Sequence, residues 1–190
     1  MLRATDLAHL LIRQHLQPGD RAVDATLGNG HDAIFLTRLV GAHGRVLAFD
    51  PQPAAHEAAR REFARQGVDA GPVTFLCCGH EEMSAQVGLE KVAAVMFNLG
   101  YLPGGDRHFT TQTATTLTAL EAAITLLESG GMLTVIAYPG HPGGAEEGLA
   151  VAALLAALPA PWKVFRHECL NARAPAPYLL IALREVEKIR

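Results

Sequence analysis

Short apolar runs typical of β-strands alternate with helical runs along most of this chain, and this alternation restricts its fold more than any other feature. The expected strands are Arg21–Thr26, Arg45–Phe49, Val73–Cys77, Val92–Phe97, Met132–Tyr138, Lys163–Glu168 and Tyr178–Leu183. Helical spacing of apolar residues predicts helices at Leu7–Leu16, Asp32–Val40, Pro53–Gln66, Thr115–Glu128 and Ala145–Leu158. Strands that alternate with helices of this length form parallel sheets covered on both faces, so the sequence predicts an α/β fold.

The last two expected strands are separated only by the irregular segment Cys169–Pro177. Because a connection without a crossover helix joins antiparallel strands, we expect this pair as a hairpin at one edge of the sheet. The complete prediction is a mostly parallel, seven-stranded sheet with an antiparallel edge hairpin and helices on both faces. No repeat or linker divides the 190 residues, so residues 1–190 are expected to form a single domain.

The charge balance restricts the partners that this chain can bind. Its 16 Lys and Arg residues and 19 Asp and Glu residues give a formal net charge of −3, which argues against a broad basic surface for nucleic acid. A local patch that contacts a folded RNA is compatible with this balance. Neither the 3 cysteines nor the 9 histidines show metal-ligand spacing, so no metal site is predicted. The odd cysteine count and a start unlike a signal sequence or membrane span predict a cytoplasmic protein.

A glycine-rich segment, Asp24–Asp32, lies at the first expected strand-to-helix turn. Glycines there let the backbone approach a ligand closely, and the following helix N-terminus offers free N–H groups. The pattern Gly28-x-Gly30-x-x-Ala33 also satisfies the fingerprint of a dinucleotide site. Asp50, which closes the second expected strand, suits the ribose hydroxyls of NAD or of S-adenosylmethionine. The turn alone therefore leaves either ligand open, as well as a tight turn without a ligand.

The carboxylates of Asp24 and Asp32 favour S-adenosylmethionine over NAD. A pyrophosphate is repelled by neighbouring carboxylates, whereas S-adenosylmethionine carries an ammonium group and a sulfonium and has no phosphate. A dinucleotide enzyme also usually carries a second substrate region, for which 190 residues leave no room.

A second motif, Phe97-Asn98-Leu99-Gly100-Tyr101, follows the fourth expected strand. Ligands of open α/β sheets bind outside the carboxyl ends of the strands, where the strand order reverses, so Asn98 is expected in the same crevice as the glycine turn. The motif resembles the [DN]-P-P-[FY] motif of methyltransferases that modify amino groups, with Leu99-Gly100 in place of the two prolines. In that motif the side-chain oxygen accepts hydrogen bonds from the target nitrogen. The alternative is a turn after a buried strand.

A third loop, Tyr138–Gly144, follows the fifth expected strand and directs a tyrosine and a histidine toward the same edge. His141 is a candidate for proton transfer, and the alternative is a solvated loop histidine. His31 and His80 are further candidates for ligand neighbours.

Taken together, residues 23–32 (VDATLGNGHD), Asp50 and residues 97–106 (FNLGYLPGGD) resemble a short bacterial family first described as rRNA methylases and now associated with the tRNA wobble uridine. The likeness extends from Asp20 to about Arg184. It implies a Rossmann-like class I methyltransferase domain that uses S-adenosyl-L-methionine. The cofactor-binding residues expected on this basis are Asp24, Thr26, Gly28, Asn29, Gly30, Asp32, Asp50, Gln52, His80, Asn98, Leu99 and Gly100.

The same resemblance implies N-methylation of the aminomethyl group of 5-aminomethyl-(2-thio)uridine at the wobble position, with the tRNA anticodon stem-loop as partner. The expected catalytic residues are Asn98, Tyr101, Asp106 and His141. The alternatives are an rRNA base methyltransferase, a small NAD-dependent oxidoreductase and a ligand-binding module without catalysis. RNA contacts are expected from Arg3, Arg13, Arg107, Lys163, Arg166 and Arg173, and a homodimer would combine two such patches.

Overall fold

The computed structural model describes residues 3–106 and 108–186, so Arg107, one of the expected RNA contacts, lies outside the described residues. The elements are α1 (Ala4–His15), β1 (Arg21–Asp24), α2 (His31–Val40), β2 (Arg45–Phe49), α3 (Pro53–Arg65), β3 (Val73–Leu76), the 3-10 helix η1 (His80–Glu82), α4 (Met83–Val87), β4 (Val92–Asn98), α5 (Thr113–Leu126), β5 (Leu127–Ala137), α6 (Gly144–Ala156), β6 (Trp162–His167) and β7 (Tyr178–Arg184).

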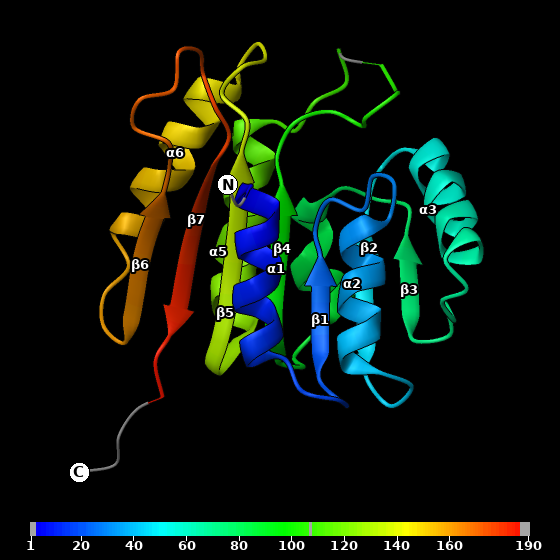
Figure 1. The fold of residues 1–190 in the computed structure, drawn as a ribbon. Helices are drawn as coiled ribbons and strands as arrows, with labels where there is room; N and C mark the ends of the chain where they lie inside the picture. The colour runs from blue at the N-terminus through cyan, green and yellow to red at the C-terminus, as the bar shows by residue number, and fades with distance from the viewer. Residues whose placement is uncertain (1–2, 107, 187–190) are drawn as a thin grey trace.

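The strands of the described residues form one seven-stranded sheet in the order β3-β2-β1-β4-β5-β7-β6 (Figure 1). Strand β1 pairs in parallel with β2 and with β4, so the strand order reverses between β1 and β4. Strand β7 runs antiparallel to both β5 and β6. The predicted mostly parallel sheet with an antiparallel edge hairpin is therefore confirmed, and β7 rather than β6 is the hairpin strand that joins the parallel part.

Successive residues of the central strands point to opposite faces of the sheet, as the two-residue period of a strand requires. Val23 and Val95 belong to a core that includes residues of α5 and α6. Their neighbours Ala22 and Ala94 belong to a second core with residues of α1 and α2. Helices therefore cover both faces, with α1 and α2 on one side and α5 and α6 on the other (Figure 1).

The boundary between the fourth long helix and the fifth strand differs from the prediction. The expected helix Thr115–Glu128 ends at Leu126, and β5 begins at Leu127 instead of Met132. Leu127 is fully buried and pairs with Val92 of β4, so packing against the sheet outweighs the helix propensity of this segment. Helix α1 begins three residues before the expected Leu7, and the other ends of the expected elements differ from the prediction by at most two residues.

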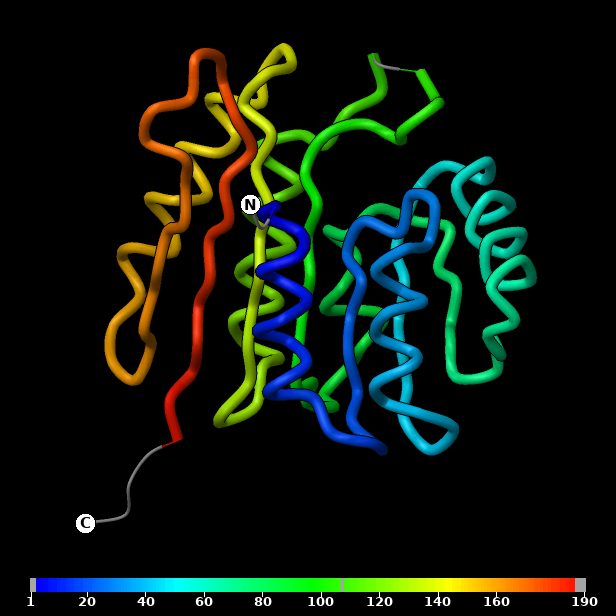
Figure 2. The backbone as a smooth tube through the Cα atoms, viewed as in Figure 1, coloured from blue at the N-terminus to red at the C-terminus, as the bar shows by residue number. Residues whose placement is uncertain are grey.

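The loops that follow β1, β4 and β5 lie at the same end of the sheet, together with the connection between β6 and β7 (Figure 2). Helix α1 contacts β4, β5 and β7 and begins near this end. The three motifs of the sequence are consequently brought to one edge of the molecule.

Candidate active site

A cleft of about 1130 Å³ extends along this edge of the sheet. Its walls come from the loops after β1, β2, β4 and β5, from the beginning of α1 and from Pro175 and Pro177. The cleft thus lies at the reversal of strand order between β1 and β4, where open α/β sheets bind ligands.

The glycine turn forms one wall of the cleft, and its two glycines have different roles. Gly28 lines the cleft with a φ of +47°, and its N–H donates to Asp50 Oδ2 at 3.1 Å. Gly30 caps the N-terminus of α2 with a φ of +84°. A Cβ at Gly30 would lie 2.8 Å from Ala59 Cβ, so this glycine permits close packing of the turn on α3.

Asp50 at the end of β2 is buried, and both of its carboxylate oxygens are fixed by backbone groups. Oδ2 accepts from Gly28 N–H, and Oδ1 accepts from Gln52 N–H at 2.9 Å. Each oxygen retains capacity for a further hydrogen bond, and Asp50 and Gln52 both line the cleft. This carboxylate can therefore accept hydrogen bonds from the hydroxyls of a ribose, while it also holds the two loops together.

Asp24 and Asp32 introduce two buried carboxylates close to the cleft. Asp24 is fully buried behind the wall, whereas Asp32 lines the cleft. Burial, and next the negative charge of Asp32, raise the pKa of Asp24 well above its ordinary range. One oxygen of Asp24 accepts from Thr26 N–H at 3.1 Å, and the other has no hydrogen-bond partner among the described residues. Among the described residues, no lysine or arginine pairs with either of these two neighbouring carboxyl groups, so this region favours a positively charged ligand.

Asp32 also connects α1 to the end of β4. Its Oδ1 lies 2.6 Å from His9 Nε2, and its Oδ2 accepts a hydrogen bond from Asn98 Nδ2. The His9 ring stacks on Phe35, with the ring centroids 3.9 Å apart. The sequence interpretation missed His9. The signal was its helical spacing from Thr5 and Ile12, which places a histidine on the buried face of α1.

The backbone and the side chain of Asn98 are fixed by the loop after β1 and by helix α2. Its N–H donates to Thr26 Oγ1 at 2.7 Å, and its amide nitrogen is bonded to Asp32. The remaining group, Asn98 Oδ1, is buried and has no partner among the described residues. The end of β4 thus presents a hydrogen-bond acceptor with a fixed direction.

The opposite wall of the cleft is formed by the loop after β4 and by the loop after β5. The Tyr101 and His141 rings lie edge to face with centroids 6.3 Å apart, and both residues line the cleft. A Cβ at Gly100 would lie 3.6 Å from His141 Nε2, which is buried and has no hydrogen-bond partner among the described residues. That distance is an ordinary van der Waals contact, whereas a Cβ at Gly144 would lie 2.7 Å from the same nitrogen, so Gly144 leaves the space that His141 occupies.

A buried glutamate of α6 holds this wall in place. Glu147 accepts hydrogen bonds from Thr111 Oγ1 at 2.8 Å and from Thr116 Oγ1 at 2.7 Å. Thr111 Oγ1 in turn accepts from Gly100 N–H at 2.9 Å. The sequence interpretation missed this network. Its signal is the position of Glu147 in the apolar stripe that continues with Val151 and Leu155, one and two turns further along α6.

Most residues predicted to contact the cofactor do line the cleft. These are Thr26, Gly28, Asn29, Asp32, Asp50, Gln52, His80, Asn98, Leu99 and Gly100. His80 is buried, with Nδ1 3.1 Å from the Ala25 carbonyl, and burial lowers its pKa. His31, named as a ligand neighbour, also lines it.

Three predicted site residues lie elsewhere. Asp24 is behind the wall, and Gly30 packs on α3. Asp106 is exposed and accepts from His108 N–H at 2.9 Å, which places its carboxylate in a local turn outside the cleft. Among the described residues, no group of three or more His, Cys, Asp and Glu side chains is arranged to hold a metal ion.

The basic residues expected to contact RNA are dispersed. Arg3 lines the cleft and pairs with Asp6, and Arg13 lies over the Phe35 ring. Lys163 on β6 lies 4.0 Å from Glu185. Arg166 and Arg173 line a second, smaller hollow beside the cleft.

The cleft fits a cationic nucleoside. Asp32 places a carboxylate at the cleft, a cation would favour ionisation of Asp24 behind it, and Asp50 presents acceptors suited to ribose hydroxyls. The fold and this site define a class I methyltransferase dependent on S-adenosyl-L-methionine. The chain belongs to the family described as "Putative rRNA methylase", whose match extends over residues 46–183.

Similar proteins support this assignment. The tRNA (mnm(5)s(2)U34)-methyltransferase, chloroplastic, of Arabidopsis thaliana is 36% identical over 193 residues, which cover 96% of this chain and 69% of that protein. The crystal structure described as "putative rRNA-methylase from Clostridium thermocellum" has 36% identity and a TM-score of 0.92, over 97% of this chain and 98% of that one. A structure described as "a putative methyltransferase from Streptococcus mutans in complex with SAH" has 33% identity and a TM-score of 0.86, over 97% and 99% of the two chains. In the described part of this chain, no helix is long and apolar enough to cross a membrane.

Proposed function

We propose that this methyltransferase N-methylates the aminomethyl group of 5-aminomethyl-(2-thio)uridine at the tRNA wobble position and produces the 5-methylaminomethyl form. The observation that carries this proposal is the buried, unpartnered Oδ1 of Asn98 at the cleft. An acceptor at this position suits a target that carries N–H bonds. The name of the Arabidopsis thaliana relative supports a tRNA wobble uridine as the target.

The neighbours of Asn98 determine which of its amide groups faces the acceptor. A carboxylate accepts hydrogen bonds and does not donate them, so the contact with Asp32 takes the amide nitrogen of Asn98. His9 holds the other oxygen of Asp32 at 2.6 Å, which limits rotation of this carboxylate. We infer that His9 and Asp32 are positioning residues, which keep Asn98 Oδ1 directed at the substrate amine.

The substrate amine must lose a proton before it can react. An alkylamine with a pKa near 10 is mostly protonated at neutral pH, and only its neutral form has a free lone pair. His141 Nε2 is a buried, unpartnered ring nitrogen on the acceptor wall, and we propose it as the proton acceptor. Tyr101, beside His141, supplies an aromatic face for the flat uracil ring. The position of Asp106 outside the cleft makes it the weaker candidate.

We assign the cofactor to the side of the cleft formed by the glycine turn. Bound S-adenosyl-L-methionine supplies a methyl group on a sulfonium sulfur, and the sulfur leaves as a neutral thioether. Asp32, which lines the cleft, would attract the positively charged end of this ligand, and that positive charge would favour ionisation of Asp24 behind the wall. Asp50 would accept from the ribose hydroxyls, and Thr26, Asn29, Gln52 and His80 would form the surrounding wall, with Leu99 and Gly100 where it meets the acceptor wall.

Nucleoside mass spectrometry of tRNA and rRNA from a strain that lacks the gene tests this proposal. We expect the 5-methylaminomethyl nucleoside to disappear and its 5-aminomethyl precursor to accumulate, with rRNA unchanged. Purified protein with S-adenosyl-L-methionine should then restore the methyl group on tRNA from that strain. Loss of an rRNA methyl mark with unchanged tRNA would refute the wobble assignment and support the rRNA alternative.

We also propose that two copies associate, which would widen a small RNA-binding surface. The edge strand β6 exposes Phe165, which offers apolar area for such a contact. Light scattering at micromolar concentration should give the mass of a dimer. A monomeric mass would refute the association.

A further inference from the structure

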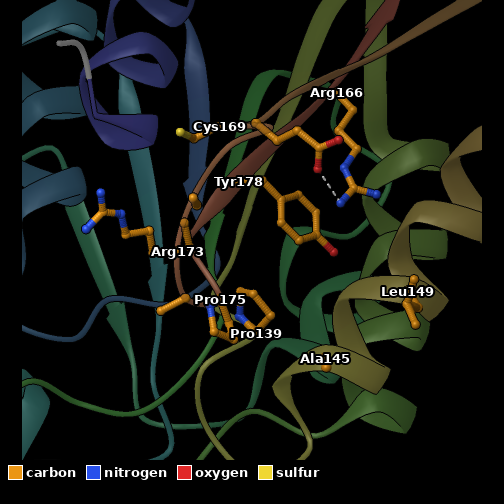
Figure 3. Close-up of a pocket in the computed structure, with 12 residues that line it drawn as sticks. Pro139, Ala145, Leu149, Arg166, Cys169, Arg173, Pro175 and Tyr178 are labelled. Carbon is orange, nitrogen blue, oxygen red and sulfur yellow. Dashed lines mark ion pairs between the residues drawn. The ribbon is translucent and has the colours of Figure 1, made fainter.

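A second hollow of about 550 Å³ lies beside the cleft, at the connection between β6 and β7 (Figure 3). Pro139 and Pro175 line both the hollow and the cleft, so the two spaces share a wall. The volume of the hollow is within the range of about 300–1000 Å³ typical of small-ligand sites.

Arg166 is held in a fixed orientation at this hollow. Its guanidinium lies over the Tyr178 ring, 4.1 Å from the ring centroid, and pairs with Glu168 at 2.5 Å. Figure 3 shows the Tyr178 ring and the Arg166 guanidinium next to one another. The Arg166 side chain nevertheless remains 41% exposed. A guanidinium plane that is supported on one face and accessible to solvent is a surface on which a nucleobase can stack.

Helix α6 supports the Tyr178 ring. A Cβ on Gly148 of α6 would lie 2.3 Å from the Tyr178 hydroxyl oxygen, so the phenol rests directly on the helix backbone. Tyr178 is buried, so packing restricts the position of the ring on which the Arg166 guanidinium lies.

Arg173 differs from Arg166 in its charge environment. It lies in the connection between β6 and β7, is exposed and extends away from Arg166 and Tyr178 (Figure 3). Glu168 compensates the charge of Arg166, whereas Arg173 has no ion pair among the described residues. An exposed, uncompensated arginine at the far side of the same hollow suits the phosphate of a nucleotide whose base lies on Arg166.

We propose that this hollow holds the nucleotide adjacent to the methylated nucleoside of the RNA substrate. Its base stacks on Arg166, and its phosphate contacts Arg173. The inference rests on the proposed function, because it requires an RNA chain whose target nucleoside enters the neighbouring cleft. It also explains how a chain with a net charge of −3 can bind RNA through local contacts.

Binding of a fluorescent anticodon stem-loop, measured by anisotropy at several salt concentrations, tests the two roles separately. Arg173→Gln should weaken binding by about 3- to 10-fold and reduce the slope of log affinity against log salt by about 0.7. Arg166→Lys keeps the charge and removes the plane, so it should weaken binding by about fivefold or more with an unchanged slope. Arg38→Gln is the matched control, because Arg38 is exposed in the last turn of α2, at the opposite end of the sheet, and should bind as the parent does.

Methylation of tRNA by the same proteins separates this inference from the proposed function. If the parent protein binds the stem-loop and the variants differ as expected, but no wobble methylation occurs, the proposed function fails and the nucleotide site stands. If the parent methylates tRNA and both Arg173→Gln and Arg166→Lys match Arg38→Gln in affinity and salt slope, the nucleotide site is refuted. Failure of the parent to bind any RNA would overturn both.

Discussion

The two walls of the cleft are held in place by different means. The wall assigned to the cofactor comes from the ends of β1 and β2, and backbone N–H groups of its own loops fix Asp50. The wall assigned to the acceptor comes from the loops after β4 and β5, and side chains of distant helices fix it: His9 of α1 through Asp32, and Glu147 of α6 through Thr111.

This difference separates binding from orientation. The Asp50 contacts use only backbone N–H groups, and the parallel pairing of β1 with β2 brings these two strand ends together. The acceptor wall depends on buried polar groups far from it in sequence, so changes there should affect turnover while cofactor affinity is retained. Four variants test this separation.

Asn98→Ala should have the largest effect. Removal of the oriented acceptor should lower the turnover number for tRNA methylation by about 100- to 1000-fold, the range observed when one transition-state hydrogen bond is lost. The affinity for S-adenosylhomocysteine should stay within about twofold of the parent by calorimetry, because the cofactor wall is intact. Methylation at the parental rate would show that Asn98 is not part of the acceptor site.

Asp50→Ala should weaken S-adenosylhomocysteine binding by about 10- to 100-fold, because charge-assisted hydrogen bonds to the ribose are lost. The variant should also unfold at a lower temperature, because the N–H groups of Gly28 and Gln52 lose their acceptor. Asp50→Asn, which keeps one acceptor oxygen, is the control. Its affinity for S-adenosylhomocysteine and its unfolding temperature should lie between those of the parent and of Asp50→Ala. Parental affinity in Asp50→Ala would place the ribose elsewhere.

Asp24→Asn should change stability and cofactor affinity in opposite directions. The pKa of Asp24 is raised above its ordinary value of 3.8, so the folded protein keeps this proton at pH values where the unfolded chain has lost it. Folding stability therefore falls as pH rises from 3.8 through the raised pKa, and Asp24→Asn removes this loss. At neutral pH the ligand-free variant should unfold a few degrees above the parent.

The same variant should bind S-adenosylhomocysteine and S-adenosyl-L-methionine differently. A bound sulfonium favours the ionised form of Asp24, which asparagine cannot adopt, so the substitution should weaken S-adenosyl-L-methionine more than the neutral thioether, by about tenfold in total. Thermal unfolding from pH 4 to pH 8 and calorimetry with both ligands give the two results. An Asp24→Asn protein that is less stable than the parent at every pH would contradict the assignment.

Glu147→Gln should have the smallest effect and the most selective one. The amide can keep one of the two hydroxyl contacts of Glu147, so the variant should fold while the Thr111 contact to Gly100 loosens. We expect turnover to fall by about three- to fivefold, the size of one weakened neutral hydrogen bond, with unchanged cofactor affinity. Glu146→Gln, an exposed neighbour on α6, is the matched control and should behave as the parent does. A larger change in cofactor affinity than in turnover would show that the network supports the other wall.

Sequence patterns located the parts of the site that depend on local chain geometry. The glycines at 28 and 30 were recognisable because a left-handed backbone and close packing on Ala59 require residues without a side chain. The expected boundary between helix and strand near Leu127 was wrong, because the pairing of Leu127 with Val92 is a contact between distant segments. Asp106 was expected near the acceptor on the basis of its motif, but its loop directs it to His108.

The sequence by itself determined the order of strands and helices, the edge of the sheet at which ligands bind and the acidic character of that edge. These properties follow from the periodicity of apolar residues and from residues that end a strand, both of which are written along a short stretch of chain. Only the tertiary structure decided that Asp32 contacts His9 and Asn98, that Glu147 holds the acceptor loop, and that Asp24 lies behind the wall. These roles depend on which segments meet when the helices pack on the sheet, and a buried polar group takes its function from the partner that it finds there.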